Sequence, residues 1–163
     1  MKIGISGSHG TGKSYTLYKL AHEYKVMYPN QEISVVTETA RKSPLPINEI
    51  ATIDSQLWMI TTQIQKEIEV QKSNDIVITD RCLSDYLAYT KFQFPDLYTR
   101  LLPFLKYYIT TYDVIYFKDI NKNDYLYDDG VRSLNKEFRK NIHYILEDMY
   151  TMLWPEIKKF ERI

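Results

Sequence analysis

A short segment near the amino terminus constrains this chain more than any other feature. Residues 7–14 read Gly-Ser-His-Gly-Thr-Gly-Lys-Ser and match the phosphate-loop (Walker A) pattern G-x-x-x-x-G-K-[ST] at every fixed position. The chain has only 5 glycines, and three of them fall in this segment, which indicates that backbone shape matters there. A strand pattern at residues 2–6 precedes the segment, and apolar residues at helical spacing follow it. This strand–loop–helix order is the context that the motif requires.

The motif predicts a nucleotide-binding loop with a magnesium ligand. Its backbone N–H groups would surround a phosphate at the positive end of the following helix. Lys13 would reach the β- and γ-phosphate oxygens, and the Ser14 hydroxyl would ligate Mg²⁺. His9 occupies a variable position, where we expect it to contact solvent rather than to act in catalysis. The predicted nucleotide-binding residues are Gly7, Ser8, His9, Gly10, Thr11, Gly12, Lys13, Ser14 and Tyr15.

Strand and helix patterns alternate along the rest of the chain. After residues 2–6, β-branched and apolar runs predict further strands at 33–37, 75–79 and 113–117. Helical spacing predicts helices after the phosphate loop, along 53–68, at 83–92, at 96–111 and around 138–149. Strands separated by helices imply a parallel sheet with right-handed crossovers, so the expected fold is layered α/β with about four strands.

Apolar spacing gives two more specific expectations. One stripe predicts the buried face of a long amphipathic helix, with Asp54 or Ser55 near its N-cap. The residues of this stripe are Ile53, Leu57, Ile60, Ile64 and Ile68. Near the carboxyl terminus, the spacing of Ile157, Phe160 and Ile163 favours a helix over a strand, so we expect no fifth strand.

Charged residues follow the second and third predicted strands. Asp80 ends the third strand, where an acid can hold Mg²⁺ directly or through water. Arg81 would lie at the mouth of the cleft in which open α/β sheets bind ligands. After the second strand, Glu38 could accept the proton of an attacking hydroxyl or orient a sugar hydroxyl, and Arg41 could clamp an acceptor phosphate. The alternatives are an ordinary ion pair at the strand end and solvated loop charges.

A polar stretch at residues 118–133 carries the next candidates. Arg132 within it, or Arg139 after it, could close over the transferring phosphoryl group and neutralise its charge. The alternative is a charge cluster at the start of a helix, in which Arg139 pairs with a neighbouring acid.

These segments resemble the P-loop nucleoside and nucleotide kinases, mainly the thymidylate-kinase-like and ribosylnicotinamide-kinase-like group with an AAA-type ATPase domain. Residues 7–14 look like their phosphate loop, and residues 80–89 look like their Asp-Arg segment with its trailing Leu-Ala-Tyr. Residues 129–134 look like the start of their lid helix, and Glu38 matches their acid after the second strand. The similarity spans most of residues 1–150. It implies a three-layer P-loop NTPase fold with a helical lid over residues 118–140.

The resemblance also implies ATP as donor, Mg²⁺ as cofactor and a nucleoside or nucleoside monophosphate as acceptor. It assigns Arg81 and Arg41 to acceptor contacts and Arg132 or Arg139 to the lid. The predicted catalytic residues are Lys13, Glu38, Asp80, Arg81, Arg132 and Arg139. The predicted substrate-binding residues are Glu38, Arg41 and Arg81, and the predicted metal ligands are Ser14 and Asp80.

Other activities remain open at this point. A nucleotide-binding regulatory module would hydrolyse ATP slowly, and a polynucleotide kinase would phosphorylate the 5′ ends of DNA or RNA. Lys and Arg together number 21, as do Asp and Glu, so no global basic field favours long nucleic acid. Residues 121–124 fit the guanine-selecting pattern N-K-x-D, but residues 80–83 lack the D-x-x-G of GTPases. We therefore interpret residues 121–124 as a polar turn.

The remaining features concern location and assembly. No apolar run approaches the roughly 20 residues of a membrane-spanning helix. A single cysteine, Cys82, suits a reducing compartment and is expected to pack in the core. His22 and His143 have no partner at metal-ligand spacing, so no zinc site is predicted. We expect one cytoplasmic domain over residues 1–163 and leave a homodimer open.

Overall fold

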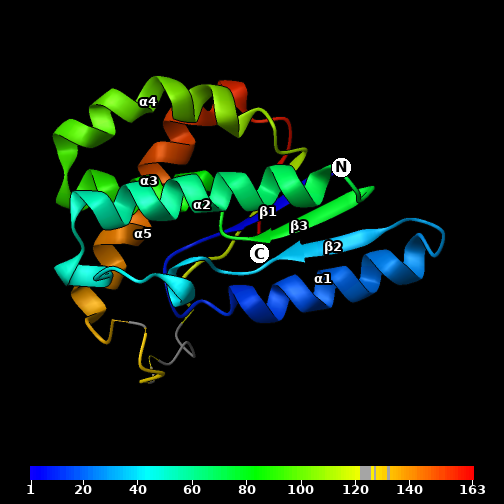
Figure 1. Cartoon of the computed structure of the whole chain (residues 1–163), viewed down its shortest axis with the longest axis horizontal. Helices are drawn as coiled ribbons and strands as arrows, with labels where there is room; N and C mark the ends of the chain where they lie inside the picture. Colours follow the sequence, from blue (N-terminus) through cyan, green and yellow to red (C-terminus); the bar gives the residue numbers. More distant parts are fainter. Residues whose placement is uncertain (122–125, 127, 132) are drawn as a thin grey trace.

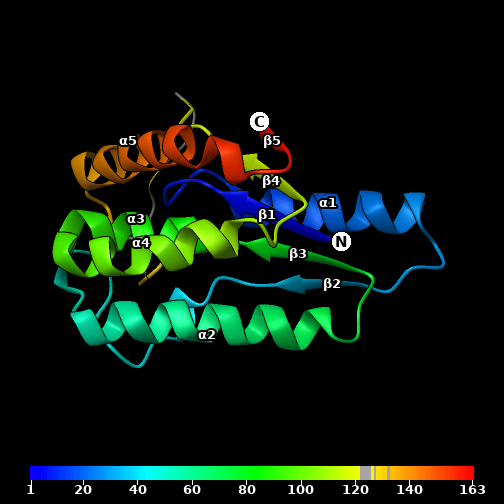
Figure 2. The ribbon, with the colours of Figure 1, turned by 90° about the horizontal axis from the view of Figure 1, so that it is seen from above.

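The structure is a computed structural model that describes residues 1–121, 126, 128–131 and 133–163. Five strands form one sheet in the order β2-β3-β1-β4-β5, and every neighbouring pair is parallel (Figure 2). The strands are β1 (Lys2–Ser6), β2 (Ile33–Val36), β3 (Ile76–Asp80), β4 (Val114–Phe117) and β5 (Phe160–Arg162). The predicted α/β class and the four predicted strands are confirmed.

Helices cover both faces of the sheet and make the fold three-layered (Figure 1). One face packs against α1 (Lys13–Met27), where Leu17 contacts Ile3 and Ile5 of β1. The other face is covered by α2 (Ile53–Gln71), α3 (Leu83–Gln93), α4 (Pro95–Ile109) and α5 (Lys136–Leu153). In Figure 1, α1 lies below the strands, and α2, α3 and α4 lie above them. The four helices of the second face form the larger apolar core with one another and with β4.

The expectation that no fifth strand exists is wrong. β5 pairs with β4, with Phe160 opposite Ile115 and Arg162 opposite Phe117. Aromatic contacts hold this short edge strand, because the Phe160 ring lies 5.9 Å from that of Phe117 and 4.9 Å from that of Tyr150. A strand this short has too few residues to display alternation, so its pattern could not be told from a helix.

The expected buried face of α2 is wrong in three of its five residues, since Ile60 is buried and Ile64 packs against the apolar core. Ile53, Leu57 and Ile68 are 48%, 36% and 61% exposed, whereas Ile60 is buried. The residues of α2 that are buried are Ser55, Gln56, Met59, Ile60, Gln63 and Glu67. The N-cap is Thr52, and Ser55 lies near it as expected: the Thr52 side chain accepts a hydrogen bond from the Ser55 backbone N–H, and the Ser55 side chain accepts one from the Thr52 backbone N–H. The helix therefore turns mainly polar side chains towards the protein interior.

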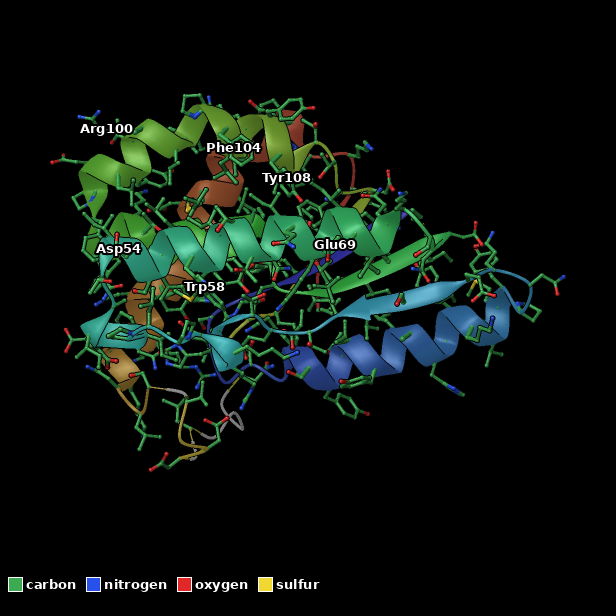
Figure 3. The ribbon with its side chains drawn as sticks, viewed as in Figure 1. Asp54, Trp58, Glu69, Arg100, Phe104 and Tyr108 are labelled. Atoms are coloured by element: carbon green, nitrogen blue, oxygen red, sulfur yellow. The ribbon has the colours of Figure 1, made fainter. Side chains whose placement is uncertain are left out.

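Those polar side chains are buried because each finds a partner. The Glu67 carboxylate accepts hydrogen bonds from Lys2 Nζ at 3.0 Å, Tyr108 OH at 3.0 Å, Tyr112 OH at 2.8 Å and Gln63 Nε2 at 2.9 Å. Tyr108 comes from α4, and in the view of Figure 3 it lies above α2, the helix that carries Glu67. A buried charge is tolerated when it is paired and hydrogen-bonded in this way.

The predicted lid is not helical in the residues that the structure describes between 118 and 135. Helix α5 begins at Lys136, where the Asn135 side chain accepts hydrogen bonds from the backbone N–H groups of Glu137 and Phe138. Of the segment predicted to start the lid helix, residues 129–131, 133 and 134 therefore lie in a loop. Arg132 and most of the polar turn at 121–124 lie outside the described residues.

The sheet positions the predicted site at one edge. β1, β3 and β4 run parallel with Ile5 opposite Asp80 and Ser6 opposite Phe117, so their carboxyl ends meet. The phosphate loop leaves the carboxyl end of β1, beside the end of β3. Ligands of open α/β sheets bind at this edge. Within the described ranges, none of the helices has the length and apolar character needed to cross a membrane.

Candidate functional site

The phosphate loop has the backbone that its glycines predict. Gly7, Gly10 and Gly12 have φ values of 145°, 73° and 75°, a region that favours glycine. A Cβ atom at Gly7 would also lie 2.7 Å from the carbonyl oxygen of Lys118. The Gly7 N–H donates to Asp85 Oδ1 at 2.9 Å, and Asp85 also accepts from the Cys82 N–H at 2.8 Å. Asp85, which the sequence did not single out as a site residue, thus fixes the entry to the loop.

The predicted phosphate and metal ligands lie together. Lys13 is buried, and its Nζ donates to the Ser8 carbonyl at 2.6 Å. Burial and the nearby Arg81 charge lower the pKa of Lys13 to about 8. Ser14 Oγ donates to Asp80 Oδ2 at 2.6 Å. This hydroxyl–carboxylate pair has the oxygen donors that Mg²⁺ prefers, so the residues present fit the ion.

A cavity surrounds these groups. It is lined by loop residues 9–14 together with Glu38, Asp80 and Arg81, and we call it the phosphate cavity. Tyr15, the last residue predicted to bind nucleotide, has a side chain that is 75% exposed, and it is not among the residues lining this cavity.

Glu38 and Arg81 form the central ion pair of the site. Glu38 Oε1 accepts from Arg81 Nε at 2.8 Å and from Nη2 at 2.7 Å, while Arg41 Nε lies 3.5 Å from Glu38 Oε2. Burial alone would raise the pKa of Glu38, but the charges of Arg81, Lys13 and Arg41 outweigh it and lower the pKa to about 2. Glu38 is therefore an ionised carboxylate throughout the neutral range.

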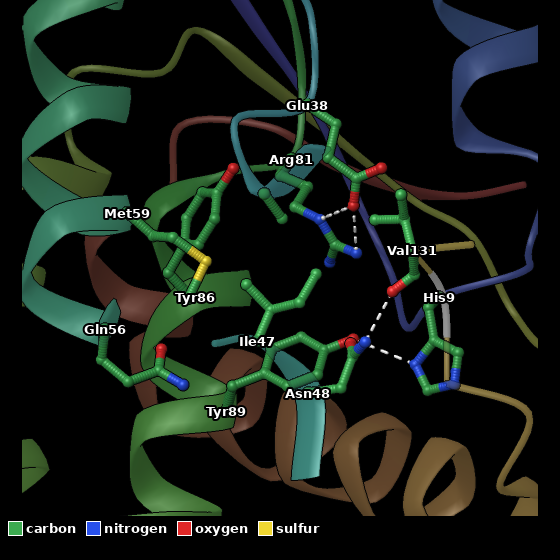
Figure 4. Close-up of a pocket in the computed structure, with 11 residues that line it drawn as sticks. His9, Glu38, Ile47, Asn48, Gln56, Met59, Arg81, Tyr86, Tyr89 and Val131 are labelled. Atoms are coloured by element: carbon green, nitrogen blue, oxygen red, sulfur yellow. Dashed lines mark hydrogen bonds and ion pairs between the residues drawn. The ribbon is translucent and has the colours of Figure 1, made fainter. Parts of the chain in front are cut away.

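A second cavity adjoins this ion pair on its other side. It encloses about 460 Å³ of space, part of it open to solvent (Figure 4). We call it the α2–α3 cavity. Its lining residues are His9, Glu38, Ala40, Ile47, Asn48, Gln56, Met59, Arg81, Tyr86, Tyr89 and Val131. Of these residues, Glu38 and Arg81 were predicted from the sequence to bind substrate, whereas Gln56 and Met59 of α2 and Val131 were not.

Backbone strain is concentrated at the α2–α3 cavity. Asn48 and Arg81 have φ values of 58° and 91°, and among the described residues they are the only non-glycine residues with positive φ. Both line the cavity. Strained conformations of this kind persist where the surrounding structure imposes them, and they cluster at ligand sites.

Three side chains line both cavities: His9, Glu38 and Arg81. The expectation that His9 contacts solvent is wrong, because the residue is only 3% exposed. Its Nδ1 lies 3.0 Å from Tyr89 OH, and its ring packs 5.9 Å from that of Phe138. The burial of His9 depends on α3 and α5, which are distant in sequence, so the loop motif gave no signal for it.

The residues predicted from the polar stretch reach the site from two directions. Arg139 is buried, and its Nη2 donates to the Gly10 carbonyl at 3.2 Å. Arg41 Nη2 donates to Asp129 Oδ2 at 2.5 Å, and Asn48 Nδ2 donates to the Val131 carbonyl at 2.6 Å. The described part of residues 128–131 therefore contacts the loop between β2 and α2.

Two clusters outside the site have structural explanations. Cys82 is buried, and burial raises the pKa of its thiol, as expected for a packed cysteine. Asp119, His143 and Glu147 bring their ligand atoms within 4.8 Å of one another, so the expectation that His143 lacks partners at metal-ligand spacing is wrong. Arg162 already pairs with both carboxylates, at 3.0 Å from Asp119 and 2.8 Å from Glu147. This cluster anchors β5.

Comparisons with known proteins agree with this architecture. The sequence matches a family described as an AAA domain over residues 2–155. No curated protein matches it. A thymidylate kinase from Ehrlichia chaffeensis superposes with a TM-score of 0.71 at 18% identity, covering 100% of this chain and 91% of that chain.

Two other solved structures share the fold. A deoxyadenosine kinase from M. mycoides, bound to dCMP and dCDP, has a TM-score of 0.66 at 16% identity and covers 100% of this chain and 90% of that one. The NadR protein in complex with NR has a TM-score of 0.72 at 22% identity, with coverage of 97% and 45%, so this chain matches less than half of NadR. At such identities these likenesses establish the fold. The family match over residues 2–155, together with the phosphate loop, shows that the chain belongs to the AAA domain family of P-loop proteins.

Proposed function

We propose that this protein is an ATP- and Mg²⁺-dependent kinase that phosphorylates a nucleoside or a nucleoside monophosphate. The observation that carries the proposal is the wall shared by the two cavities. The phosphate cavity suits the donor, the α2–α3 cavity suits an acceptor, and His9, Glu38 and Arg81 stand between them. The nucleotide and nucleoside kinases among the similar structures support this class of substrate.

The donor would be held by the phosphate loop. Lys13 would contact the β- and γ-phosphates, and Arg139 would add positive charge beside Gly10. Ser14 and Asp80 would hold Mg²⁺, which neutralises charge on the phosphate oxygens. Arg132 lies outside the described residues, and its proposed role in the lid rests on the sequence.

The ionised carboxylate at the shared wall supports a hydroxyl acceptor, because a hydroxyl would find in Glu38 a proton acceptor that a phosphate acceptor does not need. The charge of Glu38 itself is balanced by Arg81. In the proposed step the acceptor oxygen attacks the γ-phosphorus as the bond to the β–γ bridging oxygen breaks. The hydroxyl proton passes to Glu38, and ADP leaves. Arg81, which holds Glu38 in place, and Arg41 would position the acceptor.

The test is a transfer assay with radiolabelled ATP and Mg²⁺ against nucleosides, nucleoside monophosphates, ribosylnicotinamide and short oligonucleotides. Label should appear in one small-molecule class. Lys13→Ala, checked for folding by circular dichroism, should abolish the transfer. Transfer to oligonucleotides alone would indicate a polynucleotide kinase. ATP binding with only slow hydrolysis across the panel would instead indicate a regulatory module.

A further inference from the structure

A histidine and two carboxylates meet beside β5, outside the lining of both cavities. His143 and Glu147 are four residues apart in α5, which places them on the same face of that helix. Asp119 follows β4 and reaches them from the sheet. One ligand atom from each of the three side chains lies within 4.8 Å of the other two. These atoms are close enough together to bind a single metal ion.

The His143 side chain is buried and faces the carboxylates without a hydrogen bond. The residue is 8% exposed, and its ring stacks on that of Phe117 at 5.4 Å, which holds its orientation. Nδ1 is enclosed and has no partner, while Nε2 lies 3.7 Å from Asp119 Oδ1 and 3.9 Å from Glu147 Oε2. Both distances are too long for a hydrogen bond. Within the described part of the chain, Nε2 therefore points at two carboxylate oxygens and bonds to neither.

The spacing of these atoms suits a shared ion. Ligand atoms that bind one tetrahedral Zn²⁺ at about 2.0–2.1 Å lie about 3.4 Å from one another. The two distances from His143 Nε2 are a few tenths of an ångström longer, a difference that small side-chain rotations remove. An imidazole nitrogen combined with carboxylate oxygens is typical of Zn²⁺ and other transition metals, whereas Mg²⁺ and Ca²⁺ prefer oxygen ligands.

Arg162 leaves ligand positions on both carboxylates. It donates to Asp119 Oδ2 at 3.0 Å and to Glu147 Oε1 at 2.8 Å, which are not the oxygens nearest His143. It also contacts Asp119 Oδ1, but a carboxylate oxygen has two lone pairs and can serve both partners. Carboxylates that ligate metals are themselves hydrogen-bonded in this way. The Asp119 and Glu147 side chains are 36% and 33% exposed, so an ion can enter from solvent.

We propose that Asp119, His143 and Glu147 bind one Zn²⁺ ion, with a water molecule in the fourth position. Three protein ligands and one water are typical of an open zinc site. The ion would join α5 to the segment after β4, and Arg162 would extend that connection to β5. The site is independent of the proposed kinase activity, because none of its ligands lines either cavity.

The test is calorimetric titration of Zn²⁺ into the full chain at about pH 7.5, where imidazole is ordinarily neutral. Excess Mg²⁺ occupies the predicted magnesium site in the phosphate cavity. The wild type should bind one equivalent of Zn²⁺. His143→Phe keeps a ring against Phe117 and leaves both carboxylates paired with Arg162, so the fold should persist. It should nevertheless bind Zn²⁺ at least about tenfold more weakly, since even the loss of an outer partner has that effect. Glu147→Gln should weaken binding in the same way.

Two matched controls change the same residue types outside the cluster. His22→Phe replaces an exposed histidine of α1, and Asp148→Asn replaces the exposed acid that follows Glu147. Both variants should bind Zn²⁺ as the wild type does. At about 100 times its Kd, Zn²⁺ should also raise the melting temperature of the wild type by about 5 °C or more, but not that of His143→Phe.

The site would be overturned by a wild type that binds no Zn²⁺, or by His143→Phe binding the ion as tightly as the wild type. Equal losses of affinity in His22→Phe and His143→Phe would place the ion elsewhere, and they would overturn the site as well. Loss confined to His143→Phe and Glu147→Gln, with a raised melting temperature only in the proteins that bind, would support it.

Discussion

Lys13 illustrates how burial tunes a single residue of the site. An ammonium group binds phosphate oxygens only while it is charged, and its pKa in the free protein is lowered to about 8 by burial and Arg81. Below that pH the folded protein carries the charge, and above it the charge is lost. We therefore expect affinity for ATP to fall as the pH rises through about 8.

The measurement is the binding of a fluorescent ATP analogue between pH 6 and 10. Lys13→Met should bind weakly at every pH and should show no inflection. Equal affinity of the wild type at pH 7 and pH 9 would contradict the prediction. The pH dependence of kcat/KM for ATP should follow the same curve, because that ratio reports the free enzyme.

Glu38 carries the second residue-scale prediction. Its pKa of about 2 keeps it ionised, so activity should not decline on its account between pH 8 and pH 5. Glu38→Gln keeps the shape and a hydrogen-bond acceptor for Arg81 but removes the proton acceptor. With a nucleoside acceptor it should lower kcat by about 10² or more, the usual contribution of a general base.

The KM for ATP of Glu38→Gln should stay near the wild-type value, because Glu38 is assigned to the acceptor. If kcat is unchanged, the role of Glu38 is confined to holding Arg81. A nucleoside monophosphate acceptor needs no general base, so with that acceptor Glu38→Gln should change kcat little.

Local sequence predicted the parts of the site that a motif or a strand end defines. Ser14 was predicted from the phosphate-loop motif, and Asp80, Arg81 and Glu38 from their positions at or after the carboxyl ends of strands. The structure joins them in the Ser14–Asp80 contact and the Glu38–Arg81 ion pair. The positions of Gln56 and Tyr89 depend on how α2 and α3 pack across the sheet. No spacing within either helix encodes that packing, so these residues could not be predicted.

At the scale of the element, α2 buries an ion pair beside the apolar residues Met59 and Ile60 that it adds to the core. Lys2 of β1 and Glu67 of α2 lie 3.0 Å apart and are almost fully buried. Removing one partner leaves an uncompensated charge in the interior. We therefore expect Glu67→Gln to lower the free energy of unfolding by about 3–5 kcal/mol, measured by urea denaturation.

The double variant Lys2→Met with Glu67→Gln should recover part of that loss, because neither charge is then buried alone. Lys158→Ala provides the matched control, since Lys158 pairs with Asp113 on the surface and should change stability by only about 0–1 kcal/mol. Equal effects of Glu67→Gln and Lys158→Ala would show that the buried network contributes little.

The two elements that sequence patterns misread share a physical cause. In α2 the apolar spacing suggested a buried stripe, but hydrogen bonds from Lys2, Tyr108 and Tyr112 make burial of Glu67 favourable instead. In β5 contacts with Phe117 and Tyr150 determine the strand. In both cases contacts with residues distant in the sequence determine the structure: which α2 side chains are buried, and that residues 160–162 form a strand. A local sequence pattern does not contain these contacts.

At the scale of the whole molecule, the two cavities depend on one close approach between layers. Gly4 lies in the central strand β1, and a Cβ atom there would come within 2.2 Å of Cys82 Sγ and 3.1 Å of the Tyr112 ring. Cys82 is the N-cap of α3, the helix that carries Asp85, Tyr86 and Tyr89. The absent side chain of Gly4 therefore lets α3 pack close enough to the sheet to hold the phosphate loop and line the α2–α3 cavity.

Gly4→Ala should accordingly disturb stability and binding together. Overpacking costs about 1–3 kcal/mol, and a displaced α3 moves Asp85 away from Gly7 and Tyr89 away from His9. Urea denaturation should show the loss, and both ATP-analogue and nucleoside affinity should fall. Adding Cys82→Ala removes the clashing sulfur and should restore most of both properties, while Cys82→Ala alone controls for the loss of the thiol. If Gly4→Ala loses stability but binds both ligands normally, then the packing of α3 on β1 does not position the site.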